Sequence, residues 1–314
     1  MGPDASGVLL RVRTTVEEAE GVRGLLLDDP AGAALAPWEP GAHLAVELPS
    51  GTVRHYSLCG DPADRRVYRL GVLRERAGRG GSLEVHTSVG PGTRLRVRGP
   101  FNRFPLVPAE RYLFLAGGIG ITPLLPMVRS LPVGSWSLLY GGRSLGAMAY
   151  REELSALPGV TFVPQDTEGP LDVAAALRGL PETTAVYCCG PPGLLRAVEE
   201  RWGGALHTER FGAPPVGEEP RSRPEPGGFE VELRRSGSVL RVPPERSLLE
   251  VVRTVLPAVA SSCEEGWCGT CETKVVAGTP EHHDAVLSEA ERDSGTTMMI
   301  CVGRSRTPRL VLDL

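Results

Sequence analysis

The sequence predicts a multidomain chain with three folded parts. An antiparallel β-barrel is expected over residues 1–108, a doubly wound parallel α/β sheet over residues 109–212, and a small α+β domain over residues 228–314. Short β-rich segments between prolines and glycines predict the first part, and apolar strands that alternate with helical patterns predict the second. A group of closely spaced cysteines predicts the third. Residues 213–227 are rich in proline and charge, so a semi-extended linker is expected there.

Composition argues against nucleic-acid and membrane partners. The chain has 314 residues, enough for several hydrophobic cores, and a formal net charge of −4 with no basic cluster. It has no run of about 18 apolar residues, and its N-terminal stretch lacks the apolar core of a signal peptide. We therefore expect a cytoplasmic protein in which Cys59, Cys188 and Cys189 are free thiols.

Up to residue 108 the chain consists of short apolar segments separated by turn residues, which is typical of a closed antiparallel barrel. The predicted strands cover residues 8–12, 24–27, 43–48, 54–58, 67–73 and 95–97. Along the fourth strand, alternation places Arg54, Tyr56 and Leu58 on one face. His55 and Ser57 then point to the other face. Such a strand suits a phosphate and a planar ring, although a half-buried strand with an exposed arginine has the same pattern.

A glycine-rich stretch follows the fifth predicted strand. Gly78-Arg79-Gly80-Gly81-Ser82 opens a predicted short helix, whose free amide groups and Ser82 hydroxyl can bind a phosphate. Alone this signal is weak, because glycine-rich turns begin many loops.

The residue pattern changes at Arg111. Residues 112–116 are a continuous apolar run, followed by the turn Gly117-Gly118-Ile119-Gly120-Ile121-Thr122-Pro123 and a helical pattern over residues 124–131. Further predicted strands at 136–141, 160–164 and 185–188 alternate with helices at 150–157 and 171–179. In such sheets ligands bind at the carboxyl ends of the strands. The glycine turn is not G-x-G-x-x-G, so a Rossmann-type dehydrogenase is a poor fit.

Cysteines near the C-terminus have the spacing of an iron–sulfur site. Cys263, Cys268 and Cys271 follow C-x4-C-x2-C, and Cys301 lies farther along the chain, as in the four-thiolate site of a plant-type [2Fe–2S] cluster. The alternatives are buried or disulfide-bonded cysteines, or a zinc site, which usually pairs C-x2-C with a second short pair. Predicted strands at 229–233, 239–242, 274–276 and 310–312 and a helix at 248–256 complete this part.

Taken together, these motifs resemble the phthalate dioxygenase reductase family, and the likeness spans most of the chain. It rests on Arg54-His55-Tyr56-Ser57-Leu58 with the Gly-Arg-Gly-Gly-Ser stretch, on the glycine turn after residue 116, on Cys189-Gly190-Pro191 and on the cysteine spacing. The family implies an FMN-binding barrel over 1–108, an NAD-binding α/β domain over 109–212 and a β-grasp ferredoxin domain over 228–314.

The resemblance also assigns residues to a flavin site. Arg54 and Ser82 would bind the FMN phosphate, and Tyr56 and Ser57 would lie against the isoalloxazine ring. The site implied by the family consists of Arg54, Tyr56, Ser57, Leu58, Gly80, Gly81 and Ser82. FMN is expected rather than FAD, because the short Gly-Gly-Ser form resembles the FMN-binding members.

A pyridine-nucleotide site is implied in the same way. Thr122 and Cys189 would lie beside the nicotinamide as catalytic residues. The other contacts implied are Gly117, Gly118, Gly120, Arg143, Gly190, Pro191 and Phe211, with Thr122 itself among them. NADH is expected rather than NADPH, because most relatives with an arginine at the position of Arg143 prefer NADH. Tight turns, and a core aromatic at Phe211, are the simpler alternatives.

The family implies an NAD(P)H-dependent oxidoreductase, the reductase component of a multicomponent oxygenase. Electrons would pass from NADH through FMN and the [2Fe–2S] cluster to a terminal oxygenase, either Rieske-type or a cytochrome P450. A flavin is needed because nicotinamide transfers two electrons together, whereas the cluster accepts one at a time. Trp267, within the cluster loop, is a candidate contact for the acceptor. The alternative function is a redox sensor or electron carrier without steady NADH turnover.

Overall fold

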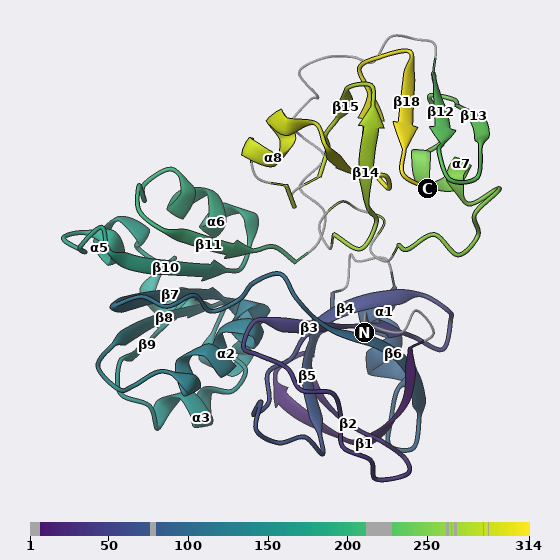
Figure 1. Cartoon of the computed structure of the whole chain (residues 1–314). Coiled ribbons are helices and arrows are strands. Elements are labelled where there is room, and N and C mark those ends of the chain that lie inside the picture. The colour runs from purple at the N-terminus through teal and green to yellow at the C-terminus, as the bar shows by residue number, and fades with distance from the viewer. Residues whose placement is uncertain are drawn as a thin grey trace. The chain divides into compact units, whose positions relative to one another are not determined.

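The structure is a computed structural model that describes residues 7–75, 80–211, 228–261, 264, 266, 269–284, 286–287 and 289–314. The chain forms two compact units, Met1–Phe211 and Gly212–Leu314 (Figure 1). The predicted linker at 213–227 lies outside the described residues. None of the helices in the described part is long and apolar enough to cross a lipid bilayer.

The first unit begins with a six-stranded antiparallel sheet in the order β4-β3-β6-β1-β2-β5. Its strands are β1 (Val8–Ala19), β2 (Val22–Asp28), β3 (Ala42–Glu47), β4 (Val53–Ser57), β5 (Tyr68–Leu73) and β6 (Arg94–Asn102). A bridge between Leu58 and Leu70 joins the two edges, so the sheet closes as the predicted barrel. Alternate strand residues fill its interior, including Leu10, Leu44 and Leu95.

Three barrel strands, β1, β2 and β6, are longer than predicted. β1 continues to Ala19 because its second half pairs with β2. Two register shifts, between Val12 and Thr14 and between Glu17 and Ala19, occur along this pairing. β6 runs through Gly99 and Pro100 to Asn102, where a register shift in its pairing with β3 accommodates these residues. Helix α1 (Gly81–Ser88) follows the barrel's fifth strand, as predicted, and buries Val85 in the barrel core.

A five-stranded parallel sheet in the order β11-β10-β7-β8-β9 forms the rest of the first unit. Its strands are β7 (Arg111–Gly117), β8 (Trp136–Gly142), β9 (Val160–Pro164), β10 (Thr184–Cys189) and β11 (Leu206–Glu209). The helices are α2 (Ile121–Ser130), α3 (Arg151–Ser155), α4 (Gln165–Glu168), α5 (Val173–Leu177) and α6 (Pro192–Glu199). This doubly wound sheet confirms the predicted fold class.

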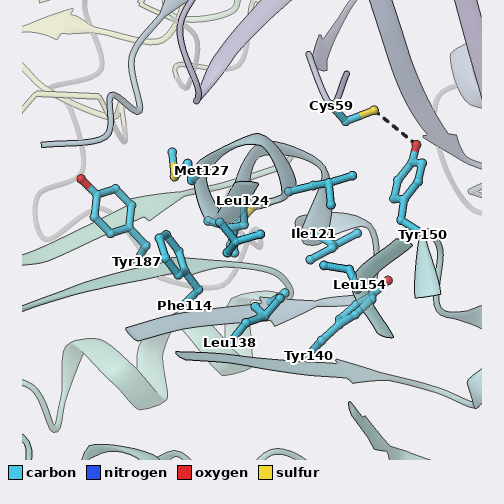
Figure 2. Packing of buried hydrophobic residues seen from close by; sticks show 14 of the residues in the cluster. Cys59, Phe114, Ile121, Leu124, Met127, Leu138, Tyr140, Tyr150, Leu154 and Tyr187 are labelled. Atoms are coloured by element: carbon cyan, nitrogen blue, oxygen red, sulfur yellow. Dashed lines mark hydrogen bonds between the residues drawn. The ribbon is translucent and has the colours of Figure 1, made fainter. Parts of the chain in front are cut away.

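The parallel sheet is buried on both faces. On one face Ile121 and Leu124 of α2 pack on Phe114 and Leu138, in a core that also includes Cys59 of the barrel side (Figure 2). On the other face the apolar sides of α5 and α6 pack on β7 and β10. Because one core contains residues from both sheets, the barrel and the parallel sheet form a single unit.

The second unit contains a mixed five-stranded sheet in the order β13-β12-β18-β14-β16. Its strands are β12 (Phe229–Leu233), β13 (Ser238–Val242), β14 (Glu272–Ala277), β16 (Thr297–Met299) and β18 (Arg309–Leu312). A short pair, β15 (Pro280–Glu281) and β17 (Arg304–Ser305), and helices α7 (Leu248–Val252) and α8 (Glu289–Ser294) complete it. The parallel pairing of β12 with β18 and the packing of α7 into the core correspond to the predicted β-grasp domain.

Candidate functional site

A cleft of about 1300 Å³ lies at the carboxyl ends of the parallel strands. Most of the residues predicted to bind the pyridine nucleotide line it: Gly117, Gly118, Gly120, Arg143, Gly190, Pro191 and Phe211. The barrel contributes a wall that the sequence did not reveal, namely Glu20, Gly21, Val22, Leu73, Arg74 and Glu75. The cleft is large enough for a dinucleotide and has the position expected for a ligand of a doubly wound sheet.

Two of the predicted glycine loops touch each other at the base of this cleft. A Cβ atom at Gly120 would lie 2.1 Å from the carbonyl oxygen of Cys189, and one at Gly117 would lie 2.5 Å from Cδ of Pro191. These positions therefore exclude side chains, which lets the loops after β7 and β10 come together. Exposed backbone amides at such a junction can bind phosphate groups.

Neither Thr122 nor Cys189 lines the cleft. Thr122 is buried, and its hydroxyl donates a hydrogen bond to the carbonyl oxygen of Ile119 at 2.9 Å. Cys189 is fully buried, and desolvation raises the pKa of its thiol well above that of a free cysteine. In this geometry both residues support the loops. Their contact with nicotinamide stays a prediction.

Strand β4 and the N-terminus of α1 come together at the predicted flavin phosphate site. A Cβ atom at Gly81 would lie 2.5 Å from Nε of Arg54, so the guanidinium group lies directly against the first turn of the helix. The Ser82 hydroxyl accepts a hydrogen bond from the amide of Glu75 at 3.0 Å, so its proton stays available to a ligand. A cation beside a helix N-terminus suits an anionic phosphate. Gly78 and Arg79 lie outside the described residues.

The two faces of β4 separate as alternation predicts. Tyr56 packs against the barrel core, and Leu58 lies within it. The Tyr56 hydroxyl is buried and has no hydrogen-bond partner in the part of the chain that the structure describes. Burial also raises its pKa above the ordinary tyrosine value, so it stays a donor. A buried phenol without a partner fits the polar edge of a bound flavin. Leu58, in contrast, helps to close the barrel.

Ser57, on the opposite face of β4, contacts a residue that sequence reasoning missed. Its hydroxyl donates a hydrogen bond to Oε2 of Glu209 at 3.3 Å. Glu209 is on β11, where it pairs with Cys189, and burial raises the pKa of its carboxyl to about 8. The only available signal was a glutamate two positions before Phe211, and nothing in the sequence relates it to Ser57.

The second unit holds the predicted cluster site. Cys271 and Cys301 are buried in its hydrophobic core, and the amide of Ile300 donates to the carbonyl oxygen of Cys271 at 3.4 Å, which links the two ligand segments. Gly266 and Gly269 have φ values of 74° and 73°, which favour glycine, and a Cβ atom at Gly266 would lie 2.6 Å from a methyl carbon of Val302. Buried thiols on tightly turned loops fit an iron–sulfur centre. Cys263, Cys268 and Trp267 lie outside the described residues.

Comparison with known proteins agrees with both units. Residues 231–305 match the 2Fe-2S iron-sulfur cluster binding domain. A solved structure of phthalate dioxygenase reductase, described as modular for electron transfer from pyridine nucleotides to [2Fe–2S], has 36% sequence identity and a TM-score of 0.72, and the match covers 98% of each chain. The chain belongs to the phthalate dioxygenase reductase family. It is therefore an oxidoreductase with the fold of that family.

Two further comparisons concern oxygenase systems. The phenoxybenzoate dioxygenase subunit beta of Ectopseudomonas oleovorans is 42% identical over 98% of this chain and 97% of its own length. An intact type IV self-sufficient cytochrome P450 monooxygenase has 36% identity and a TM-score of 0.88. That match covers 98% of this chain but only 41% of the P450 chain, so the present chain corresponds to about two fifths of the larger protein.

Proposed function

We propose that this member of the phthalate dioxygenase reductase family is the reductase component of an oxygenase system. It takes electrons from NADH and passes them through FMN and a [2Fe–2S] cluster to a terminal oxygenase. The observation that carries the proposal is the presence, in one chain, of the dinucleotide-sized cleft beside Gly117 and Gly190, the Arg54–Gly81 phosphate site and the buried Cys271 and Cys301 thiols.

Each region has a separate task in this function. When bound, FMN supplies the change from a two-electron donor to a one-electron acceptor. Arg54 and the first turn of α1 would hold its phosphate, and the Tyr56 hydroxyl would donate a hydrogen bond to the flavin. The glycine loops after β7 and β10 hold NADH, with Arg143 toward the adenosine and Phe211 at the rim. Cys263, Cys268, Cys271 and Cys301 hold the cluster.

The functional division that we propose follows the predicted boundaries: flavin barrel 1–108, nucleotide domain 109–212, linker 213–227 and ferredoxin domain 228–314. The protein supplies positioning and no catalytic acid–base pair. Because NADH is an internal metabolite and the buried thiols of Cys59 and Cys188 suit a reducing compartment, we place the protein in the cytoplasm.

The acceptor that we propose is a Rieske-type oxygenase or a cytochrome P450. The dioxygenase subunit that is 42% identical supports an oxygenase system, and the P450 monooxygenase that contains a region similar to this chain supports a haem acceptor. Reconstitution separates the two: NADH oxidation coupled to product formation is measured with a Rieske-type oxygenase and, separately, with a cytochrome P450.

The first test is the absorbance spectrum of the purified protein under anaerobic conditions, before and after NADH, with the released flavin identified. We expect a flavin band and a broad iron–sulfur band, both of which bleach on addition of NADH. A cluster spectrum with no bleaching by NADH would replace this function with that of an electron carrier or redox sensor.

A further inference from the structure

Tyr150, which precedes helix α3, has a backbone conformation that side chains rarely adopt. Its φ is 60° and its ψ is 19°, in the left-handed region, yet it is a buried tyrosine with 3% of its surface exposed. Among the described residues only Glu264 is another non-glycine with positive φ. A bulky residue held in this region persists only where its surroundings fix it, so its contacts merit a functional explanation.

The Tyr150 hydroxyl reaches across to the barrel side of the unit. It lies 3.3 Å from Sγ of Cys59 (Figure 2). That sulfur donates to the carbonyl oxygen of Arg69 at 3.3 Å. Burial raises the pKa of the Cys59 thiol to about 12 and that of Tyr150 well above its usual value, so both groups keep their protons. The result is a donor chain from Tyr150 through Cys59 to the backbone of β5.

The ring of Tyr150, like its hydroxyl, is held by contacts with residues of the barrel. The Arg69 guanidinium lies over it, 4.6 Å from the ring centre. Arg69 also pairs with Glu18 of β1 at 2.8 Å and with Glu153 of α3 at 2.7 Å. One arginine therefore binds the barrel, the ring and the following helix together, with the cation held by two partly buried carboxylates.

Strand β5 has a glycine where Tyr150 meets it. A Cβ atom at Gly71 would lie 2.3 Å from the Tyr150 hydroxyl oxygen and 3.0 Å from Cγ2 of Thr122. Gly71 pairs with Gly24 of β2, where a Cβ atom would lie 2.5 Å from the carboxylate of Glu18. The barrel thus has glycines, Gly71 and Gly24, where Tyr150, Thr122 and Glu18 pack closely against its strands.

The same strand leads directly to both cofactor sites. Leu73, Arg74 and Glu75 follow Gly71 and line the nucleotide cleft, and the Glu75 amide binds the Ser82 hydroxyl at the start of α1. Ala149, next to Tyr150 in the chain, also lines the cleft. A displacement of Gly71 by Tyr150 would therefore also move Leu73, two residues along the chain, which lines the cleft. It would also affect the predicted flavin phosphate site, because Glu75 is hydrogen-bonded to Ser82.

We propose that Tyr150 is a positioning residue that holds β5 against Thr122 and so sets the alignment of the nicotinamide with the flavin. This inference rests on the proposed function, because it assigns a spacing role within NADH-to-FMN transfer. Small displacements of reacting groups cost large factors in rate, so the contact affects the transfer step more than nucleotide affinity. A role in packing alone predicts lower stability with an unchanged transfer rate.

Tyr150→Phe removes only the hydroxyl and keeps the ring over which Arg69 lies. The matched control is Tyr112→Phe, because Tyr112 is also buried and its hydroxyl accepts from Ala109 and donates to Val107 at the opposite end of β7 from the cleft. The rate constant for anaerobic flavin reduction is measured by stopped flow, together with the apparent Kd for NADH, FMN content per chain and reduction by dithionite. We expect Tyr150→Phe to slow reduction by NADH about tenfold with little change in Kd, and Tyr112→Phe to leave the rate unchanged.

A double-mutant cycle gives a readout that does not depend on turnover. Gly71→Ala introduces the clash with the Tyr150 hydroxyl, and removing that oxygen in Gly71→Ala/Tyr150→Phe relieves the shortest contact. The thermal unfolding midpoint of the double variant is expected to lie above that of Gly71→Ala, although each single change lowers it. If Gly71→Ala does not fold, the rate constant for flavin reduction in Tyr150→Phe alone tests the proposal.

The outcomes separate this inference from the function on which it rests. Unchanged flavin reduction in Tyr150→Phe, or equal slowing in Tyr112→Phe, overturns it. Loss of FMN from Tyr150→Phe also overturns it, because the residue would then retain the flavin rather than align the nicotinamide. If NADH fails to reduce the wild-type flavin while dithionite reduces it, the proposed function is wrong, and the inference about Tyr150 is wrong with it.

Discussion

The Ser57 hydroxyl donates a hydrogen bond to the Glu209 carboxyl at 3.3 Å, which joins the fourth strand of the barrel to the last strand of the parallel sheet. Burial raises the pKa of Glu209 to about 8, and the hydrogen bond from Ser57 acts in the opposite direction. A carboxyl group that is largely protonated at neutral pH therefore contacts Ser57 of the predicted flavin site and is paired along the sheet with Cys189 of the predicted nucleotide site.

Glu209 is expected to make the first unit less stable as pH rises. Its folded pKa exceeds the ordinary value of 4.5, so the folded state binds the extra proton between about pH 4.5 and 8. The stabilisation is complete below pH 4.5 and is lost as pH rises through 8, at up to about 1.4 kcal/mol per pH unit. Glu209→Gln should flatten this profile, measured as unfolding midpoints from pH 5 to 9. Ser57→Ala should move the transition to higher pH. A Glu209→Gln profile parallel to that of the wild type contradicts this assignment.

Arg54 is expected to control FMN affinity. Arg54→Gln removes the cation beside Gly81 and should weaken FMN binding about tenfold to a hundredfold, since hydrogen bonds to charged groups contribute about 1.5–3 kcal/mol. Recovery of FMN fluorescence on dilution measures the Kd. Arg23→Gln is the control, because Arg23 donates to the carbonyl oxygen of His86 at 2.7 Å, at the other end of α1. Equal FMN loss in both variants would indicate a general effect on the helix.

Gly120 is expected to tolerate no side chain. In Gly120→Ala the new Cβ atom would lie 2.1 Å from the Cys189 carbonyl oxygen, so the loops after β7 and β10 must separate. We expect the NADH concentration that half-bleaches the flavin to rise about tenfold or more, with a lower melting temperature. Gly203→Ala is the control, because nothing lies within 4 Å of an added Cβ atom there. Normal NADH titration of Gly120→Ala would remove this loop junction from the nucleotide site.

Cys301 is expected to be needed for the cluster and not for flavin reduction. Cys301→Ser should lower bound iron and acid-labile sulfide and abolish reduction of cytochrome c, while NADH still bleaches the flavin. Cys188→Ala is the control, because Cys188 is buried among the apolar side chains between the parallel sheet and α5 and α6. Full iron content in Cys301→Ser would exclude Cys301 as a ligand.

Local patterns predicted the fold class and most of the strands, but they missed strands β11 and β16 and helices α4, α6 and α8. Alternation along β4 separates Tyr56 from Ser57, and the apolar run before Gly117 identifies a strand buried on both faces. Both signals come from neighbouring residues in the chain. Boundaries were less accurate where pairing decides them: β1 extends to Ala19 because β2 continues beside it. Helix α3 begins only after Tyr150, because Tyr150 has a left-handed backbone and cannot be part of the helix.

The sequence by itself supplied the candidate residues of each site, because a [2Fe–2S] cluster or a phosphate needs particular residues at short spacing, and the family resemblance supplied the class of the flavin and nucleotide sites. Cys271 and the glycines after β7 are such residues. Only the tertiary structure decided which distant residues complete those sites. The pairing of Ser57 with Glu209, the approach of Arg54 to Gly81 and the contact of Tyr150 with Gly71 join segments far apart in the chain. Such contacts leave no periodic signal, since they arise from the packing of the barrel and the parallel sheet around one shared core.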